Sequence, residues 1–214
     1  MENEPKNLTP PGSPAPGDVL LAAILFEGGL ALLALVLGHF LQVPPLAALL
    51  PANGHTPPWL AAGMGVLATV PAVLLALLLD RWPLTAGLRR LKHLMRHEVG
   101  VWFRPLRLWE IALVSLLAGV GEELLFRGLV QRGLAQLGPL ANSPWLPLVL
   151  ASLVFGACHA LTKTYAVLAA GMGAYLGALY LMTGDLIAPI ITHALYDFVL
   201  LALYAHAAST PSQC

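Results

Sequence analysis

Residues 108–134, "LWEIALVSLLAGVGEELLFRGLVQRGL", decide the fold. This stretch is almost continuously apolar and is longer than the roughly 20 helical residues that cross a bilayer. Yet Glu122, Glu123 and Arg127 lie in its middle. A charged side chain at the bilayer centre costs at least about 2.5 to 3.5 kcal/mol, so such groups are usually paired and often functional. The stretch therefore predicts a membrane helix that carries a functional site.

The composition of the whole chain supports a membrane protein. Of 214 residues, 58% are hydrophobic and 10% are charged, whereas soluble domains carry about 25% charged residues. The formal net charge is zero, so no basic face indicates a nucleic-acid partner. The two cysteines, Cys158 and Cys214, provide neither a disulfide framework nor a Cys-based metal motif. The lipid bilayer is the partner that the composition predicts.

Apolar runs of this kind recur along the chain and predict an all-α, polytopic transmembrane helical bundle of about six spans. The runs cover residues 19–41, 59–79, 108–134, 145–161, 165–182 and 186–205. Prolines that would break a helix fall between them, at Pro44, Pro45, Pro57, Pro58, Pro139 and Pro144.

These runs also predict how the chain is divided. Residues 1–18 are rich in Pro and Gly and predict a disordered tail. Two N-terminal transmembrane helices follow in residues 19–79, then a basic segment in 80–107. A four-helix membrane core, the expected catalytic part, occupies 108–206, and a short tail occupies 207–214.

The basic segment sets the expected orientation. Seven of the 11 Lys and Arg residues lie in it: Arg81, Arg89, Arg90, Lys92, Arg96, Arg104 and Arg107. The positive-inside rule places them in the cytoplasm, and six spans then place both termini there. Leu84, Leu88 and Leu91 recur at helical spacing and predict a short amphipathic helix; a solvated basic loop is the alternative. The Ala, Leu, Gly and Pro content and the lack of an organelle address favour a bacterial plasma membrane.

Ionisable residues in three of the predicted spans could converge on one site. Glu123 and Arg127 are four residues apart and can pair on one helix face, whereas Glu122 is rotated by about 100° and lacks an obvious local partner. The sequence "FGACH" ends at His159, and "HALYD" runs from His193 to Asp197. A glutamate, two histidines and an aspartate are typical of a proton-transfer site or a metal site.

These motifs resemble a known family. "EELLFR" fits Glu-Glu-xxx-Arg, "FGACH" fits Phe-xxx-His and "HALYD" fits His-xxx-Asn/Asp, in that order. They are similar to the motifs of the CPBP family, the CAAX-prenyl protease and bacteriocin-processing (Abi) intramembrane endopeptidases. The resemblance covers about residues 108–204. It implies hydrolysis of a peptide bond in a hydrophobic or lipidated substrate at the membrane.

The resemblance also implies roles for the motif residues. Glu122 would be the general base that activates water, and His159 would help to hold that water. His193 and Asp197 would bind the scissile carbonyl and its oxyanion, while Glu123, Arg127 and Phe155 would support the structure. The family's founding eukaryotic enzymes carry Asn where this chain carries Asp197. Because an ionised Asp cannot donate a hydrogen bond, Asp197 is protonated, orients His193, or belongs to a metal site.

The need for a cofactor is left open by the sequence. Zinc in a catalytic site needs about three protein ligands, and Glu122, His159 and His193 could supply them. The chain lacks His-Glu-xx-His, and we favour a mechanism without a metal. A proton-coupled transporter and a non-catalytic bacteriocin-immunity or scaffold protein are the alternative functions. Glu27 and His39 lie outside the motifs and are interpreted as packing or interfacial residues.

Overall fold

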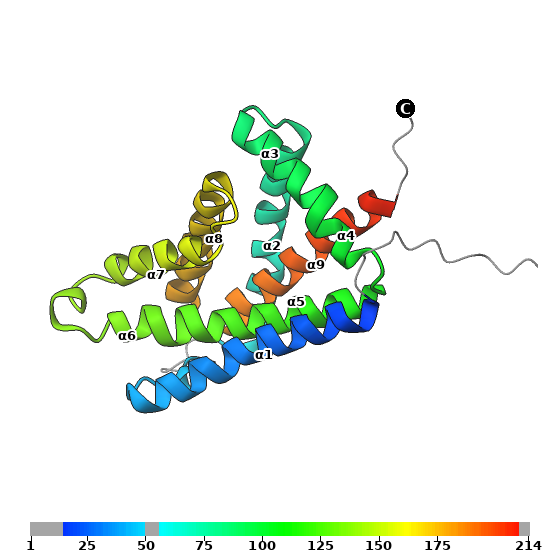
Figure 1. Ribbon diagram of the computed structural model, residues 1–214. Coiled ribbons are helices and arrows are strands. Elements are labelled where there is room, and N and C mark those ends of the chain that lie inside the picture. The colour runs from blue at the N-terminus through cyan, green and yellow to red at the C-terminus, as the bar shows by residue number, and fades with distance from the viewer. Residues whose placement is uncertain (1–14, 50–55, 210–214) are drawn as a thin grey trace, which may run out of the picture.

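The computed structural model describes residues 15–49 and 56–209, which form a bundle of helices (Figure 1). The helices are α1 (Pro16–Phe40), α2 (Pro58–Arg81), α3 (Ala86–Leu94), α4 (Gly100–Phe103), α5 (Leu108–Glu123), α6 (Arg132–Leu134), α7 (Trp145–Cys158), α8 (Lys163–Thr183) and α9 (Ile187–Ser209). Within the described ranges there is no strand, and the all-α prediction is confirmed. Most of the predicted N-terminal tail, residues 1–14, and the last five residues lie outside these ranges.

The helices of a multi-pass membrane protein are present. By length and composition, α1, α2, α8 and α9 can each cross a membrane. The run at 108–134 is one continuous helix, in which α5 passes through a π-helical segment, Leu124–Gln131, into α6 (Figure 1). The fourth run is shorter than predicted, because α7 ends at Cys158. At 14 residues, α7 is about 21 Å long, less than the roughly 30 Å of a hydrocarbon core.

Helices α1 and α5 lie side by side and run in the same direction (Figure 1). Near their N-termini, Val19 packs in one cluster with Leu106 and Ile111. Further along, Ala34 packs in another cluster with Leu124. Both helices therefore start on the same side of the bundle, as the predicted orientation requires.

Two glycines bring other helices against the site on α5. A Cβ atom at Gly121 would lie 2.5 Å from the carbonyl oxygen of Glu27 on α1, and one at Gly119 would lie 2.9 Å from that of Ile190 on α9. No residue with a side chain allows such backbone approaches without a shift. The glycines therefore place α1 and α9 directly beside the two glutamates of the opening motif.

The basic segment is helical and is fastened to α2. Helix α3 begins after Thr85, whose hydroxyl oxygen accepts a 3.2 Å hydrogen bond from the Leu88 N–H, as a helix N-cap does. Near the end of α2, Asp80 binds Arg96 at 2.6 Å through its carboxylate and Lys92 at 2.6 Å through its carbonyl oxygen. These contacts hold the predicted amphipathic helix across one end of the bundle.

The predicted orientation can be measured with a single cysteine. We expect a cysteine at position 90, in a chain whose Cys158 and Cys214 are changed to Ser, to resist a membrane-impermeant thiol reagent in intact cells and to react after lysis. The reason is the concentration of Lys and Arg in residues 80–107, which favours the cytoplasmic side. Labelling in intact cells would reverse the assigned orientation.

Candidate active site

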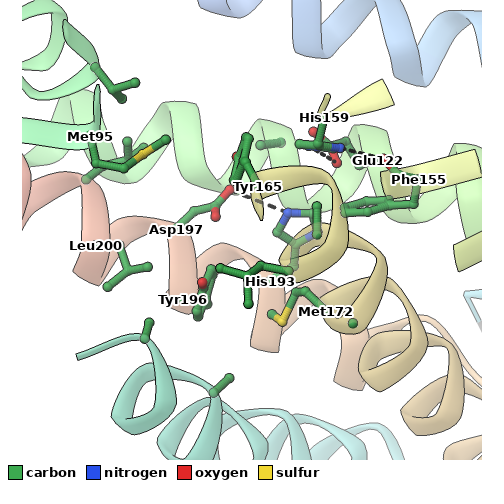
Figure 2. A pocket seen from close by; sticks show the side chains of 18 of the residues that line it. Met95, Glu122, Phe155, His159, Tyr165, Met172, His193, Tyr196, Asp197 and Leu200 are labelled. Carbon is green, nitrogen blue, oxygen red and sulfur yellow. Dashed lines mark hydrogen bonds and ion pairs between the residues drawn. The ribbon is translucent and has the colours of Figure 1, made fainter. Parts of the chain in front are cut away.

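A cavity of about 930 Å³ lies between α1, α2, α5, α8, α9 and the helical segment that follows α2, at the end of α7 (Figure 2). Most of its lining is apolar. Leu88, Leu91 and Met95 line it, so the apolar side of the amphipathic helix faces this cavity. The charged, histidine and serine side chains in the lining are Glu27, Asp80, Lys92, Ser115, Glu122, His159, His193 and Asp197.

Glu122 and His159 face each other across one corner of the cavity (Figure 2). Glu122 is 7% exposed, and its Oε2 lies 3.6 Å from His159 Nε2. The other ring nitrogen, Nδ1, is 2.8 Å from the carbonyl oxygen of Phe155. A carbonyl oxygen can only accept, so Nδ1 carries the hydrogen and Nε2 of the neutral ring is an acceptor. Two acceptor atoms thus point at the same small space.

Glu123 connects two elements of the site. Its Oε1 accepts a 2.6 Å bond from Arg127 Nη1 and a 2.8 Å bond from His193 Nδ1. The intrahelical pair with Arg127 was expected from the spacing, whereas the contact with His193 was not. Glu123 is 0% exposed and Arg127 is 1% exposed. The pair therefore lies in the interior and also fixes the orientation of the His193 ring.

Phe155 packs between charged and aromatic groups of the site. Its ring stacks on His159 with centroids 4.4 Å apart, and the Arg127 guanidinium lies 4.8 Å from its centroid. Arg127 also donates a 2.8 Å bond to the carbonyl oxygen of Gly173 on α8. These contacts fit the supporting role expected of Phe155 and Arg127, because they join α5, α7 and α8.

His193 and Asp197 form the side of the cavity that α9 provides (Figure 2). His193 Nε2 lies 3.5 Å from Asp197 Oδ2, and the Asp197 side chain is partly exposed. Because Nδ1 donates to Glu123, only Nε2 of His193 remains for a ligand. The four residues expected to act together, Glu122, His159, His193 and Asp197, therefore all line one cavity.

The sequence interpretation missed several polar residues of the cavity, among them Glu27 and Ser115. Glu27, interpreted as a packing or interfacial residue, lines it from α1, and Ser115 lines it from α5. A carboxylate inside an apolar span was a signal for Glu27, because such groups are costly in a membrane. Ser115 carried no such signal, because serine is common in membrane helices.

The side chains as placed do not fit a zinc site. Among residues 15–49 and 56–209, no group of three or more His, Cys, Asp or Glu side chains is arranged to hold a metal ion. Of the three expected ligands, His193 donates from Nδ1 to Glu123 at 2.8 Å, which leaves Nε2, 3.5 Å from Asp197 Oδ2, as its one atom for a metal. Catalytic zinc needs about three protein ligands around one point, and this arrangement does not provide them.

Comparison with known proteins gives a family match. The family model of type II CAAX prenyl endopeptidase Rce1-like proteins matches residues 104–199. No curated protein and no solved structure matches the chain significantly. The matched segment includes α5 to α8 and the part of α9 that carries His193 and Asp197. Over residues 104–199, this multi-pass membrane chain is similar to the Rce1-like family of type II CAAX prenyl endopeptidases.

Proposed function

We propose that the chain is an intramembrane endopeptidase in which Glu122 and His159 activate a water molecule. The observation that carries this proposal is the 3.6 Å separation of Glu122 Oε2 and His159 Nε2 at the cavity wall. That distance is too long for a direct hydrogen bond, and both atoms are acceptors when His159 is neutral. One water molecule can donate to both atoms.

The chemistry then follows from the positions of these acceptors. Glu122 takes a proton from the water molecule. At the same time the water oxygen attacks the scissile carbonyl carbon, and the carbonyl becomes a tetrahedral oxyanion. Glu122 then returns that proton to the nitrogen of the leaving amine as the C–N bond breaks. Burial of Glu122 removes competing bulk water, so its carboxylate is available to the bound molecule.

We assign the binding of the substrate carbonyl to His193, with Asp197 beside it. Glu123 fixes the His193 ring through Nδ1, and Nε2 then points toward Asp197 and the cavity. When the ring is doubly protonated, Nε2–H is a donor that can stabilise the oxyanion. Asp197 is assigned to orient this ring, because its Oδ2 lies 3.5 Å from His193 Nε2. This assignment uses no metal ion.

The cavity supports a hydrophobic or lipidated peptide as substrate. Its apolar walls come from long stretches of α2 and α8, including Leu75, Leu79 and Met172. Apolar surfaces of this size bind apolar chains by removing them from water. We assign the enzyme to a bacterial plasma membrane, with both termini in the cytoplasm.

A cleavage assay with purified protein tests the function. The protein in detergent is incubated with a set of quenched hydrophobic peptides, with and without a metal chelator. Cleavage that the chelator leaves unchanged is the expected result. Cleavage that stops with chelator and returns with zinc would replace the metal-free mechanism, and no cleavage of any peptide would favour a transporter or scaffold.

Asp197→Asn is expected to retain activity within about tenfold of the parent, whereas Asp197→Ala should lose about 100-fold, because the His193 ring loses the group that orients it as an oxyanion donor. Asn can accept from His193 and can itself donate to an oxyanion. The measurement is kcat on a cleaved peptide, with thermal unfolding as the check on folding. If Asn is as damaging as Ala, the negative charge of Asp197 is itself required.

A further inference from the structure

Glu27 is a carboxylate in the cavity that the proposed mechanism does not use. It lies on α1, outside the matched segment 104–199, and it lines the same cavity as Glu122 and Asp197. Its Oε2 is buried and has no hydrogen-bond partner within the described part of the chain. An unpaired carboxylate in apolar surroundings is costly, so a partner from outside the chain would stabilise it.

Ser115 is a second polar group of the cavity that lacks a partner. It is 1% exposed, it lines the cavity, and among the described residues its Oγ has no hydrogen-bond partner. Ser115 and Glu122 are seven residues apart, two helical turns, so both lie on the face of α5 that the cavity meets. The Ser115 hydroxyl and the Glu27 carboxylate thus both line the cavity with an oxygen that lacks a partner among the described residues. They indicate a place for a ligand that donates hydrogen bonds.

The charges around the cavity specify which donor fits. Lys92 lines the cavity and is bound to Asp80, and Arg127, beside the site, is bound to Glu123 and Gly173. Glu122 and Asp197 lie 3.6 and 3.5 Å from His159 and His193, whereas Glu27 has no Lys, Arg or His paired with it among the described residues. Carboxylates therefore outnumber Lys and Arg in the cavity lining. This excess of negative charge in apolar surroundings favours a cation.

We propose that Glu27, assisted by Ser115, binds the basic side chain of a lysine or arginine in the substrate. The preferred substrate is then an apolar peptide segment that carries one basic residue near the scissile bond. The apolar walls accept the peptide, and the carboxylate of Glu27 pairs with the ammonium or guanidinium group. This substrate preference rests on the proposed endopeptidase function, but the pairing itself is a binding property.

Equilibrium binding tests the pairing without any need for cleavage. The probes are dansyl-labelled Leu/Ala peptides with one Lys, moved one position at a time, and matched peptides in which that Lys is acetylated. We expect the parent protein in detergent to bind the best Lys peptide about 10- to 100-fold more tightly than its acetylated match, the usual effect of a hydrogen bond to a charged group. Glu27→Gln should abolish this preference and leave binding of the acetylated peptide unchanged.

Three further variants separate recognition from folding. Glu98→Gln removes an exposed carboxylate that does not line the cavity, and it should keep the full preference. Glu27→Asp should keep part of it, and Ser115→Ala should reduce it severalfold. An equal affinity of the parent for Lys and acetyl-Lys peptides would overturn the proposal, as would an unchanged preference in Glu27→Gln.

The same peptides distinguish failure of this inference from failure of the proposed function. If the parent binds Lys peptides preferentially but cleaves none of the set, the cation subsite stands and the endopeptidase function fails. If the parent cleaves peptides but Lys and acetyl-Lys substrates have equal KM, the function stands and the role of Glu27 is wrong.

Discussion

Glu122→Gln is expected to fold like the parent and to cleave a peptide substrate about 100- to 10,000-fold more slowly, which is the usual contribution of a general base. Gln has nearly the size and shape of Glu, so the 7% exposed position should accept it without repacking. The amide cannot take a proton from water. The measurements are kcat on a cleaved peptide and thermal unfolding in detergent.

Glu110→Gln is the matched control for this substitution. Glu110 lies on the same helix, where its carboxylate accepts a 2.6 Å bond from the Arg107 backbone N–H, and it does not line the cavity. The same chemical change there should leave kcat within a few-fold of the parent, because a capping interaction of about 1 kcal/mol concerns stability and not the reaction.

His159→Ala should reduce the rate to a similar extent, and the double variant should cost little more than either single change. Residues that act on the same water are not additive, and the 3.6 Å separation of the two side chains supports such joint action. Fully additive losses would mean that the two residues act in different steps. If Glu122→Gln cleaves as fast as the parent, the mechanism fails and a transporter or scaffold becomes the better interpretation.

The helices and the Glu123–Arg127 pair could be predicted because each depends on local sequence. Apolar runs set the helices, and a spacing of four residues sets the ion pair, which has a length of 2.6 Å in the structure. The contact between Glu123 and His193 could not be predicted in this way. It joins residues 70 positions apart and depends on how α5 and α9 are rotated against each other.

The surroundings of the site show a second limit of sequence patterns. The spacing of Leu88 and Leu91 predicts an apolar helix face, but the same pattern suits a membrane surface or a protein cavity. The contacts of Lys92 and Arg96 with Asp80 hold that face against the cavity. Glu27 was interpreted as a packing or interfacial residue, and its place in the cavity lining could not be predicted, because a single residue without a motif does not indicate which neighbours the fold will bring to it.

Arg127→Ala is expected to destabilise the protein by about 3 to 5 kcal/mol, the usual cost of removing one partner of a buried ion pair. The change leaves Glu123, at 0% exposure, without its 2.6 Å partner. It also removes the 2.8 Å bond to the Gly173 carbonyl oxygen and the contact with the Phe155 ring. Yield and melting temperature in detergent should fall together.

Arg132→Ala is the matched control, because Arg132 follows on the same continuous helix and donates a 2.7 Å bond to the Pro44 carbonyl oxygen at an exposed site. It should cost less than about 1 kcal/mol, as exposed polar contacts do. The double variant Glu123→Gln/Arg127→Met should be more stable than Arg127→Ala, since it leaves no unpaired charge. If Arg127→Ala instead unfolds at the parent's temperature but cleaves nothing, Arg127 takes part in the chemistry, and the support of α5, α7 and α8 must come from packing around Phe155.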